Sequence, residues 1–188
     1  MKYGAIDIGT NAARLLIGEV VHDSGRSFVK KISYTRIPLR LGDDVFSLGR
    51  VDVKKKLNLI NTMKAFEIIT DIFEVEHLQA YATSAMREAE NASQIVMDIK
   101  GATGIDVKII SGAEEANVIL GTFMLLDFDK GQPFVVIDVG GGSTEINIFK
   151  KGEKVGSRSF KVGTLRILRG KFDEAVWSEI NEWISAYI

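Results

Sequence analysis

The sequence predicts a mixed α/β fold, and two observations support this prediction. Stretches with the period of β-strands alternate along the chain with stretches whose apolar residues recur every three to four positions, as in helices. In addition, the strand–turn–strand segment at the start of the chain recurs without gaps near residue 136, so that Asp7 aligns with Asp138 and Gly9 with Gly140. We therefore interpret the chain as a duplicated α/β unit.

The first unit is expected to alternate between strands and helices. Apolar residues Leu57, Ile60 and Met63 predict a helix over residues 53–73 and are expected in the core. Ser111 and Glu114 have the spacing of a capping box, which begins a helix to about residue 126. The other expected elements are strands at 3–8, 14–21, 28–34, 77–83 and 107–110, a turn at 42–44, and a helix from the N-cap Asn91 to residue 99.

The second unit is expected to be shorter than the first. We predict an N-terminal domain over residues 1–122 and the first part of a second, duplicated domain over residues 123–188. After a few strands the pattern becomes helical, with Val176, Ile180 and Trp183 on one face. So few elements leave a sheet edge uncovered and a core half made. The second domain is therefore expected to be incomplete, and the chain to be a fragment of a longer protein.

The composition is that of a soluble globular protein, with 46% apolar and 26% charged residues among 188. The net charge of −1 gives no bulk attraction to nucleic acid or to a membrane surface. The absence of cysteine excludes disulfides and thiolate metal sites. No apolar run approaches the roughly 20 residues of a membrane span. Because Met1 leads almost directly into a strand, no signal peptide is expected, and a cytoplasmic location is the default prediction.

Each copy of the repeat carries a glycine-led turn between two strands. Glycine lets backbone N–H groups approach an anion closely, and successive N–H groups in a tight turn form a nest for phosphate. A Gly-Gly-Gly turn alone is also compatible with a merely flexible loop, but its repeat partner favours phosphate binding. The predicted phosphate loops are Gly9, Thr10 and Asn11 in the first copy, and Gly140, Gly141, Gly142 and Ser143 in the second.

Four segments, at residues 5–11, 82–89, 109–116 and 136–145, resemble the exopolyphosphatase/guanosine pentaphosphate phosphatase (Ppx/GppA) family of the actin-like ATPase superfamily. The paired glycine turns mark the superfamily, while the Ser-Gly-x-Glu-Glu-Ala segment and the turn at Arg87 mark this family. The resemblance implies a ribonuclease H-like fold of mixed sheets flanked by helices. The chain departs from the pattern at Ala12 and Ala13, where similar proteins often carry a serine and a larger residue.

Hydrolysis of a phosphoanhydride needs an aligned water and a group that accepts its proton. The resemblance implies that Glu115 is this general base. The capping box gives a separate reason, because it occupies the carboxylate of Glu114. The alternative is that both glutamates are solvated acids favoured by the helix dipole. Arg87 follows a strand end and would bind phosphate bidentately, unless it forms a surface ion pair with Glu88 or Glu90.

Three carboxylates are the predicted ligands of Mg²⁺. Asp7 and Asp138 lie at strand ends, where they could hold the ion directly or through water. The family pattern implies a metal or water contact for Glu145. The alternatives are hydrogen bonds from the aspartates to turn N–H groups, and a cross-strand ion pair for Glu145.

These features predict a Mg²⁺-dependent phosphatase that removes terminal phosphate from inorganic polyphosphate or from guanosine pentaphosphate. The sequence does not choose between these substrates. Two alternatives stay open: an ATP-dependent small-molecule kinase or ATPase of the same superfamily, and a non-enzymatic sensor of polyphosphate or alarmone. The kinase would need an adenosine-binding element, and none is evident before Ile188. The open sheet edge also allows two chains to pair as a homodimer.

Overall fold

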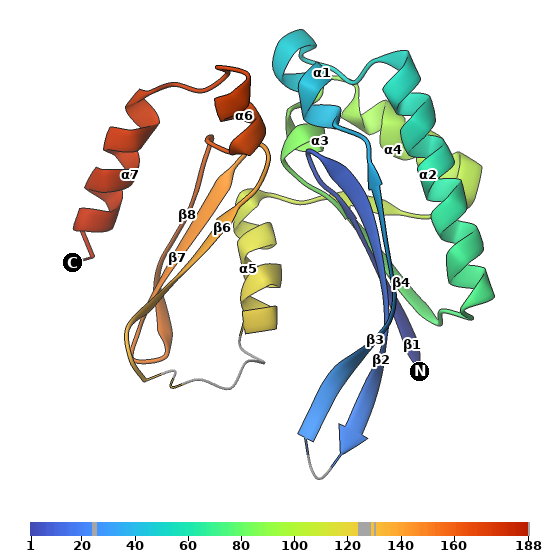
Figure 1. Cartoon of the computed structure of the whole chain (residues 1–188), viewed down its shortest axis with the longest axis horizontal. Helices are drawn as coiled ribbons and strands as arrows, with labels where there is room; N and C mark the ends of the chain where they lie inside the picture. The colour runs from blue at the N-terminus through green and yellow to red at the C-terminus, as the bar shows by residue number, and fades with distance from the viewer. Residues whose placement is uncertain (24–25, 124–128, 130, 188) are drawn as a thin grey trace. The chain divides into compact units, whose positions relative to one another are not determined.

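The computed structural model describes the whole chain except residues 24–25, 124–128, 130 and 188 (Figure 1). The chain divides into two compact units, Met1–Ile110 and Ser111–Ile188. The helix that follows Ser111, α5 (Gly112–Phe123), packs against strands of the second unit. The structure thus groups this helix with the second unit, whereas the boundary predicted at residue 122 placed it in the first.

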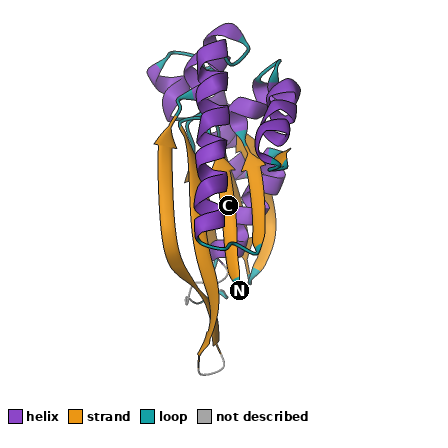
Figure 2. Ribbon diagram, turned by 90° about the vertical axis from the view of Figure 1, so that its right-hand side faces the viewer, coloured by secondary structure: helices purple, strands orange, loops and turns teal. Residues whose placement is uncertain are grey.

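The first unit is built on a five-stranded mixed sheet with the strand order β3-β2-β1-β4-β5. The first three strands are antiparallel, and β4 and β5 run parallel to β1. This is the ribonuclease H-like arrangement that the resemblance implies. Beyond Lys2 at the start of β1, β2 and β3 continue as a two-stranded ribbon (Figures 1 and 2). The strands are β1 (Lys2–Ile8), β2 (Ala12–Asp23), β3 (Arg26–Pro38), β4 (His77–Ala82) and β5 (Val107–Ile109).

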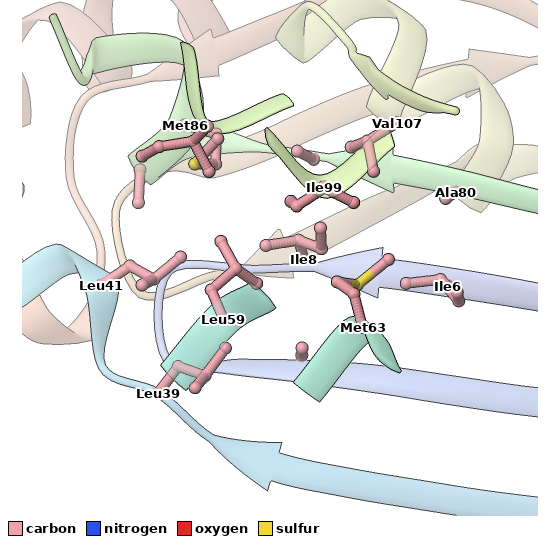
Figure 3. Close-up of a cluster of buried hydrophobic side chains, with 14 of the residues drawn as sticks. Ile6, Ile8, Leu39, Leu41, Leu59, Met63, Ala80, Met86, Ile99 and Val107 are labelled. Atoms are coloured by element: carbon pink, nitrogen blue, oxygen red, sulfur yellow. The ribbon is translucent and has the colours of Figure 1, made fainter. Parts of the chain in front are cut away.

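One face of this sheet forms the core of the first unit, because alternation along the strands turns apolar side chains to the same side. Helices α2 (Val53–Ile72) and α4 (Ala92–Thr103) contribute side chains to that core. Figure 3 shows side chains of β1, α2 and α4 meeting there. Residues of this core with 0–1% exposure include Ile6, Ile8, Leu15, Ile17, Leu59, Met63 and Ile99.

Two short helices were not predicted. Residues 42–44, expected as a turn, lie in helix α1 (Leu41–Leu48), and α3 (Ser84–Glu88) follows β4 directly. In α1, Leu41 and Val45 are one helical turn apart and both buried. Such a helix is held by tertiary packing, which a local turn signal does not reveal.

The helix predicted over residues 53–73 is confirmed as α2, but its buried face differs from the prediction. Leu57 is 57% exposed, and the core contacts come from Leu59, Met63 and Phe66. The expectation that Leu57 lies in the core was therefore wrong. Ile60 is partly buried against the same cluster.

Helix α4 begins after Asn91 as predicted, yet the Asn91 side chain does not cap it. The amide instead accepts from the N–H of Val51 at 3.1 Å and donates to the Val51 carbonyl at 2.9 Å. The helix also continues past residue 99, its expected end, through Gly101, and is capped at Gly104, whose φ is 70°. Only the second glycine takes the left-handed conformation that commonly terminates a helix.

The second unit contains a three-stranded antiparallel sheet with the order β6-β7-β8. Helix α7 packs on one face, where Val176 and Trp183 join Ile146, Ile148 and Phe160. The predicted apolar face of this helix is therefore confirmed. The elements are β6 (Phe134–Val139), β7 (Thr144–Lys150), β8 (Glu153–Phe160), α6 (Thr164–Leu168) and α7 (Ala175–Ser185).

Strand β6 forms an edge of this sheet, with no strand of the described residues on its outer side. Its Val135, Ile137 and Val139 are 51–57% exposed. In the repeat, Ile137 and Val139 align with Ile6 and Ile8, which are fully buried in the first unit. The edge of the second sheet at β6 is thus uncovered within the described residues. In the described part of the chain, no helix is both long and apolar enough to cross a membrane.

Candidate active site

The two glycine turns have the same backbone hydrogen bond at equivalent positions. The N–H of Gly9 donates to the Ala12 carbonyl at 3.0 Å, and the N–H of Gly140 donates to the Ser143 carbonyl at 2.9 Å. A side chain on either glycine would approach that same carbonyl oxygen, at 3.4 Å and 3.2 Å. The duplication predicted from sequence is thus repeated in the turn geometry.

The carbonyls of the second turn are held from one side by the start of helix α6. Gly140 O accepts from the N–H of Thr164 at 3.0 Å, and Gly141 O accepts from the N–H of Leu165 at 2.9 Å. Gly142 O accepts from the guanidinium Nε of Arg166 at 2.5 Å. In a planar trans peptide the N–H points opposite to the carbonyl before it.

The N–H groups of Gly141, Gly142 and Ser143 are consequently directed away from α6. Within the described residues, these three N–H groups have no hydrogen-bond partner. Successive N–H groups on one side of a turn are the arrangement of an anion nest. The geometry is therefore suited to bind phosphate at the second loop.

The carbonyls of the first turn are held in a related way. The N–H of Gly42 donates to Thr10 O at 3.0 Å. Asn11 O accepts from the N–H groups of Leu39 at 3.0 Å and Arg40 at 2.8 Å. All three of these donors are backbone groups.

Two carboxylates face each other across the second hairpin. Asp138 of β6 pairs with Glu145 of β7 in the strand register, so their side chains lie on the same face of the sheet. Glu145 is 1% exposed, and its Oε1 accepts from the Ser159 hydroxyl at 2.7 Å. Like charges directly opposite each other are destabilising unless a cation compensates them. One predicted alternative was a cross-strand ion pair for Glu145. Asp138 cannot be the partner in such a pair, because both groups are acids.

The equivalent position in the first hairpin is neutralised. Asp7 pairs in register with Arg14, and the Arg14 Nη1 donates to Asp7 Oδ2 at 2.6 Å. Both side chains are more than 40% exposed. Asp7 is thus engaged with a cation of the protein itself, whereas the acids of the second hairpin face one another.

The capping box at the start of α5 is confirmed. The Ser111 N–H donates to Glu114 Oε2 at 2.9 Å, and the Glu114 N–H donates to the Ser111 hydroxyl at 3.2 Å. Glu114 is therefore occupied at the helix start, as predicted, while Glu115 is half-buried.

The first turn of α5 lies against the acidic face of the second sheet. A Cβ on Gly112 would come within 2.7 Å of Ser159 Cβ and 3.8 Å of Glu145 Oε1, so only glycine fits this approach without a shift. Residues three apart share a helix face, which places Glu115 on the same side of α5 as Gly112. The start of α5 thus lies beside Glu145 and Ser159 of the second sheet.

Arg87 lies in the first unit, at the end of α3. Its Nη1 donates to the carbonyl of Ile110 at 2.9 Å, and the side chain is half-buried. The Arg87 guanidinium is therefore anchored at the carboxyl end of the parallel strands β4 and β5, the end where ligands bind in α/β sheets.

Several residues around these groups were not predicted from the sequence. A Cβ on Gly163 would lie 2.6 Å from Gly141 C, so glycine is needed for α6 to approach the second loop. Arg14 could have been found, because it occupies the repeat position of Glu145. No local pattern marks Gly163, Ser159 or Arg166, since their contacts join distant parts of the sequence.

Comparison with known proteins gives one consistent family. A family model described as the Ppx/GppA phosphatase family matches residues 20–182. Exopolyphosphatase 2 of Mycobacterium tuberculosis is 32% identical over 171 residues, which cover 88% of this chain and 53% of that protein. The guanosine-5'-triphosphate,3'-diphosphate pyrophosphatase of Aeromonas hydrophila is 27% identical over 177 residues, which cover 94% of this chain and 35% of that protein.

Solved structures agree with this result. The crystal structure of an exopolyphosphatase from Cytophaga hutchinsonii matches with a TM-score of 0.82 and 27% identity, covering 99% of this chain and 60% of that chain. The Ppx/GppA family member of Aquifex aeolicus matches with a TM-score of 0.77 and 25% identity, covering 100% of this chain and 61% of that chain. The chain therefore spans about half the length of the exopolyphosphatase 2 that it matches. With the predicted actin-like fold confirmed as well, this chain belongs to the Ppx/GppA phosphatase family.

Proposed function

We propose that the protein is a Mg²⁺-dependent phosphoanhydride hydrolase that removes terminal phosphate from inorganic polyphosphate or guanosine pentaphosphate. The observation that carries the proposal is the second hairpin, which combines a nest of N–H groups with the facing carboxylates of Asp138 and Glu145. The turn of this hairpin is suited to a phosphate, and the acidic pair beside the turn is suited to a cation. The relatives named as an exopolyphosphatase and as a guanosine-5'-triphosphate,3'-diphosphate pyrophosphatase suggest the two substrate classes.

The residues of the second hairpin fit Mg²⁺. Among the described residues, no three histidines, aspartates or glutamates gather into a metal site. Asp138 and Glu145 can supply two carboxylates, and Mg²⁺ commonly takes only one or two from the protein, with water and phosphate oxygens as its other ligands. The bound ion would neutralise charge on the phosphates. Asp7, already paired with Arg14, is the weaker candidate of the three predicted ligands.

The roles of the other residues follow from the chemistry. We assign Glu115 as the base that accepts a proton from the attacking water, while the bond between terminal phosphorus and bridging oxygen breaks. The N–H groups of the second loop, Gly140 to Ser143, would bind phosphate oxygens. The first loop, Gly9 to Asn11, would bind phosphate by the same means. Arg87 would add a charge-assisted contact to phosphate.

The test is orthophosphate release from polyphosphate and from guanosine pentaphosphate by the intact protein, with and without Mg²⁺ and with no other nucleotide present. Glu115→Gln should lower turnover by at least about 100-fold, the usual contribution of a general base, and leave binding intact. Glu114→Gln is the matched control, because glutamine also serves in a capping box. Equal loss in both variants, or release that requires ATP, would reject the proposal.

A cytoplasmic location and a homodimer remain predictions from the sequence. The exposed edge of β6 is the surface on which a second chain could pair.

A further inference from the structure

Arg166 is a buried arginine with a specific partner. It lies in α6, is 7% exposed, and donates from Nε to the carbonyl of Gly142 at 2.5 Å. Arginine is rarely buried so completely unless it is paired. One of its partners is the third glycine of the second loop. We propose that Arg166 is a positioning residue that sets the anion-binding geometry of this loop, an inference that rests on the proposed function.

The contact at Gly142 differs from its neighbours because it depends on a side chain. The carbonyls of Gly140 and Gly141 accept from backbone N–H groups, which any residue except proline would supply. No backbone N–H of the described residues donates to the Gly142 carbonyl. A charged donor forms a stronger hydrogen bond than a neutral one. Lysine has no N–H at the Nε position of arginine and cannot reproduce this contact from the same place.

Fixing the Gly142 carbonyl also fixes the N–H of Ser143, because both belong to one planar peptide. With Arg166 in place, this N–H points away from α6 together with those of Gly141 and Gly142. Three consecutive glycines have no side chains to restrict their own dihedral angles. Without Arg166 the third peptide would be free to rotate, and a phosphate would have to order it on binding. Ordering a loop on binding lowers affinity.

The first loop provides a comparison inside the same chain. The carbonyl of Asn11, equivalent to that of Gly142 in the repeat, accepts from two backbone N–H groups, those of Leu39 and Arg40. Both of these donors are backbone groups. The side-chain contact from Arg166 is thus a feature of the second loop, where the loop residues before Ser143 are all glycine.

The experiment uses the intact, ¹⁵N-labelled protein in EDTA, so that metal binding does not contribute. The amide resonances of Gly141, Gly142 and Ser143 are followed without ligand and during titration with inorganic tripolyphosphate. In Arg166→Lys these resonances should shift before ligand is added, and the Kd for tripolyphosphate should rise about tenfold, as expected for loss of a charge-assisted hydrogen bond. Arg158→Lys is the matched control at an exposed arginine of the same unit and should change the Kd by less than roughly twofold.

The outcomes separate this inference from the proposed function. If tripolyphosphate does not perturb the three amides of the unaltered protein, the phosphate loop itself fails. If it does, and Arg166→Lys binds equally well with unshifted amides, only the positioning role fails. Should Arg166→Lys be unfolded, Arg166→Met is measured instead, because its side chain has no N–H donor, and the same amide shifts and rise in Kd are expected. If both variants are unfolded, Arg166 is a residue of stability alone and the inference is overturned.

Discussion

The hairpin at Asp7 and the hairpin at Asp138 have the same backbone arrangement but differ in the charges of their facing side chains. Both place an aspartate at a strand end, and both close the turn with the same hydrogen bond, from Gly9 to Ala12 and from Gly140 to Ser143. Across the strand pair, however, Asp7 meets Arg14, while Asp138 meets Glu145. The first hairpin therefore compensates its own charge, and the second does not.

This difference indicates where the chain tolerates an unfavourable local arrangement. Facing carboxylates are destabilising, and one of them, Glu145, is almost completely buried. Natural sequences break local rules of this kind mainly at functional sites. The second hairpin is thus the better candidate for a cation and for the chemistry, and the first for holding phosphate alone.

The largest expected effect comes from the packing of the second loop. Gly163→Ala would place a Cβ within 2.7 Å of backbone atoms of Gly140 and Gly141, which cannot move aside as a side chain would. Overpacking of this kind costs about 1–3 kcal/mol of unfolding free energy. Urea unfolding followed by tryptophan fluorescence measures it, because Trp177 and Trp183 both lie in α7 of the second unit.

The control for this change is Gly121→Ala in α5. A Cβ at Gly121 meets no atom within 4 Å, and alanine in a helix stabilises by up to about 1 kcal/mol relative to glycine. Gly163→Ala should therefore lower the midpoint of urea unfolding, and Gly121→Ala should raise it. A neutral or stabilising Gly163→Ala would mean that α6 does not hold the second loop closely.

A smaller change in the unfolding free energy, opposite in sign to that of Gly163→Ala, is expected when one acid of the pair Asp138 and Glu145 is made neutral. Glu145→Gln removes the like-charge contact with Asp138 and should raise the unfolding free energy in EDTA by about 0.2–1 kcal/mol. It should also abolish the increase in Tm that we expect Mg²⁺ to give the unaltered protein, since a ligand stabilises only the state that binds it. Glu182→Gln, at an exposed position of α7, should change neither quantity. A variant that is less stable in EDTA and still responds to Mg²⁺ would contradict the charge comparison.

Much of this comparison was accessible from the sequence, because it depends on local patterns. The gapless repeat placed Asp7 over Asp138, and the capping box of Ser111 and Glu114 needs only residues three apart. Applying the same repeat to the partner strand would also have placed Arg14 at the position of Glu145. Periodicity gave the helix at residues 53–73 but not its buried face, since Leu57 and Leu59 are equally apolar and only tertiary packing chooses between them.

The contact between Arg166 and the second loop could not be predicted from such local patterns. Arg166 and Gly142 are far apart in sequence, and their contact exists only because α6 returns to the turn. The predicted turn at 42–44 failed for a related reason: α1 is stabilised by burial of Leu41 and Val45, which lies outside what a turn signal encodes.

The smallest effect is expected in the first hairpin. Asp7→Asn removes the ion pair with Arg14, whose two side chains are each more than 40% exposed, so the loss should be at most about 1 kcal/mol. The sign is opposite to that of Glu145→Gln, because here the substitution removes an attraction instead of a repulsion. Far-UV circular dichroism follows the unfolding of both units and tryptophan fluorescence that of the second alone, so the loss should appear in the first signal and not in the second. The increase in Tm expected with Mg²⁺ should persist in Asp7→Asn. Loss of this increase would show that the first hairpin also takes part in metal binding. The two hairpins would then be less different than their charges indicate.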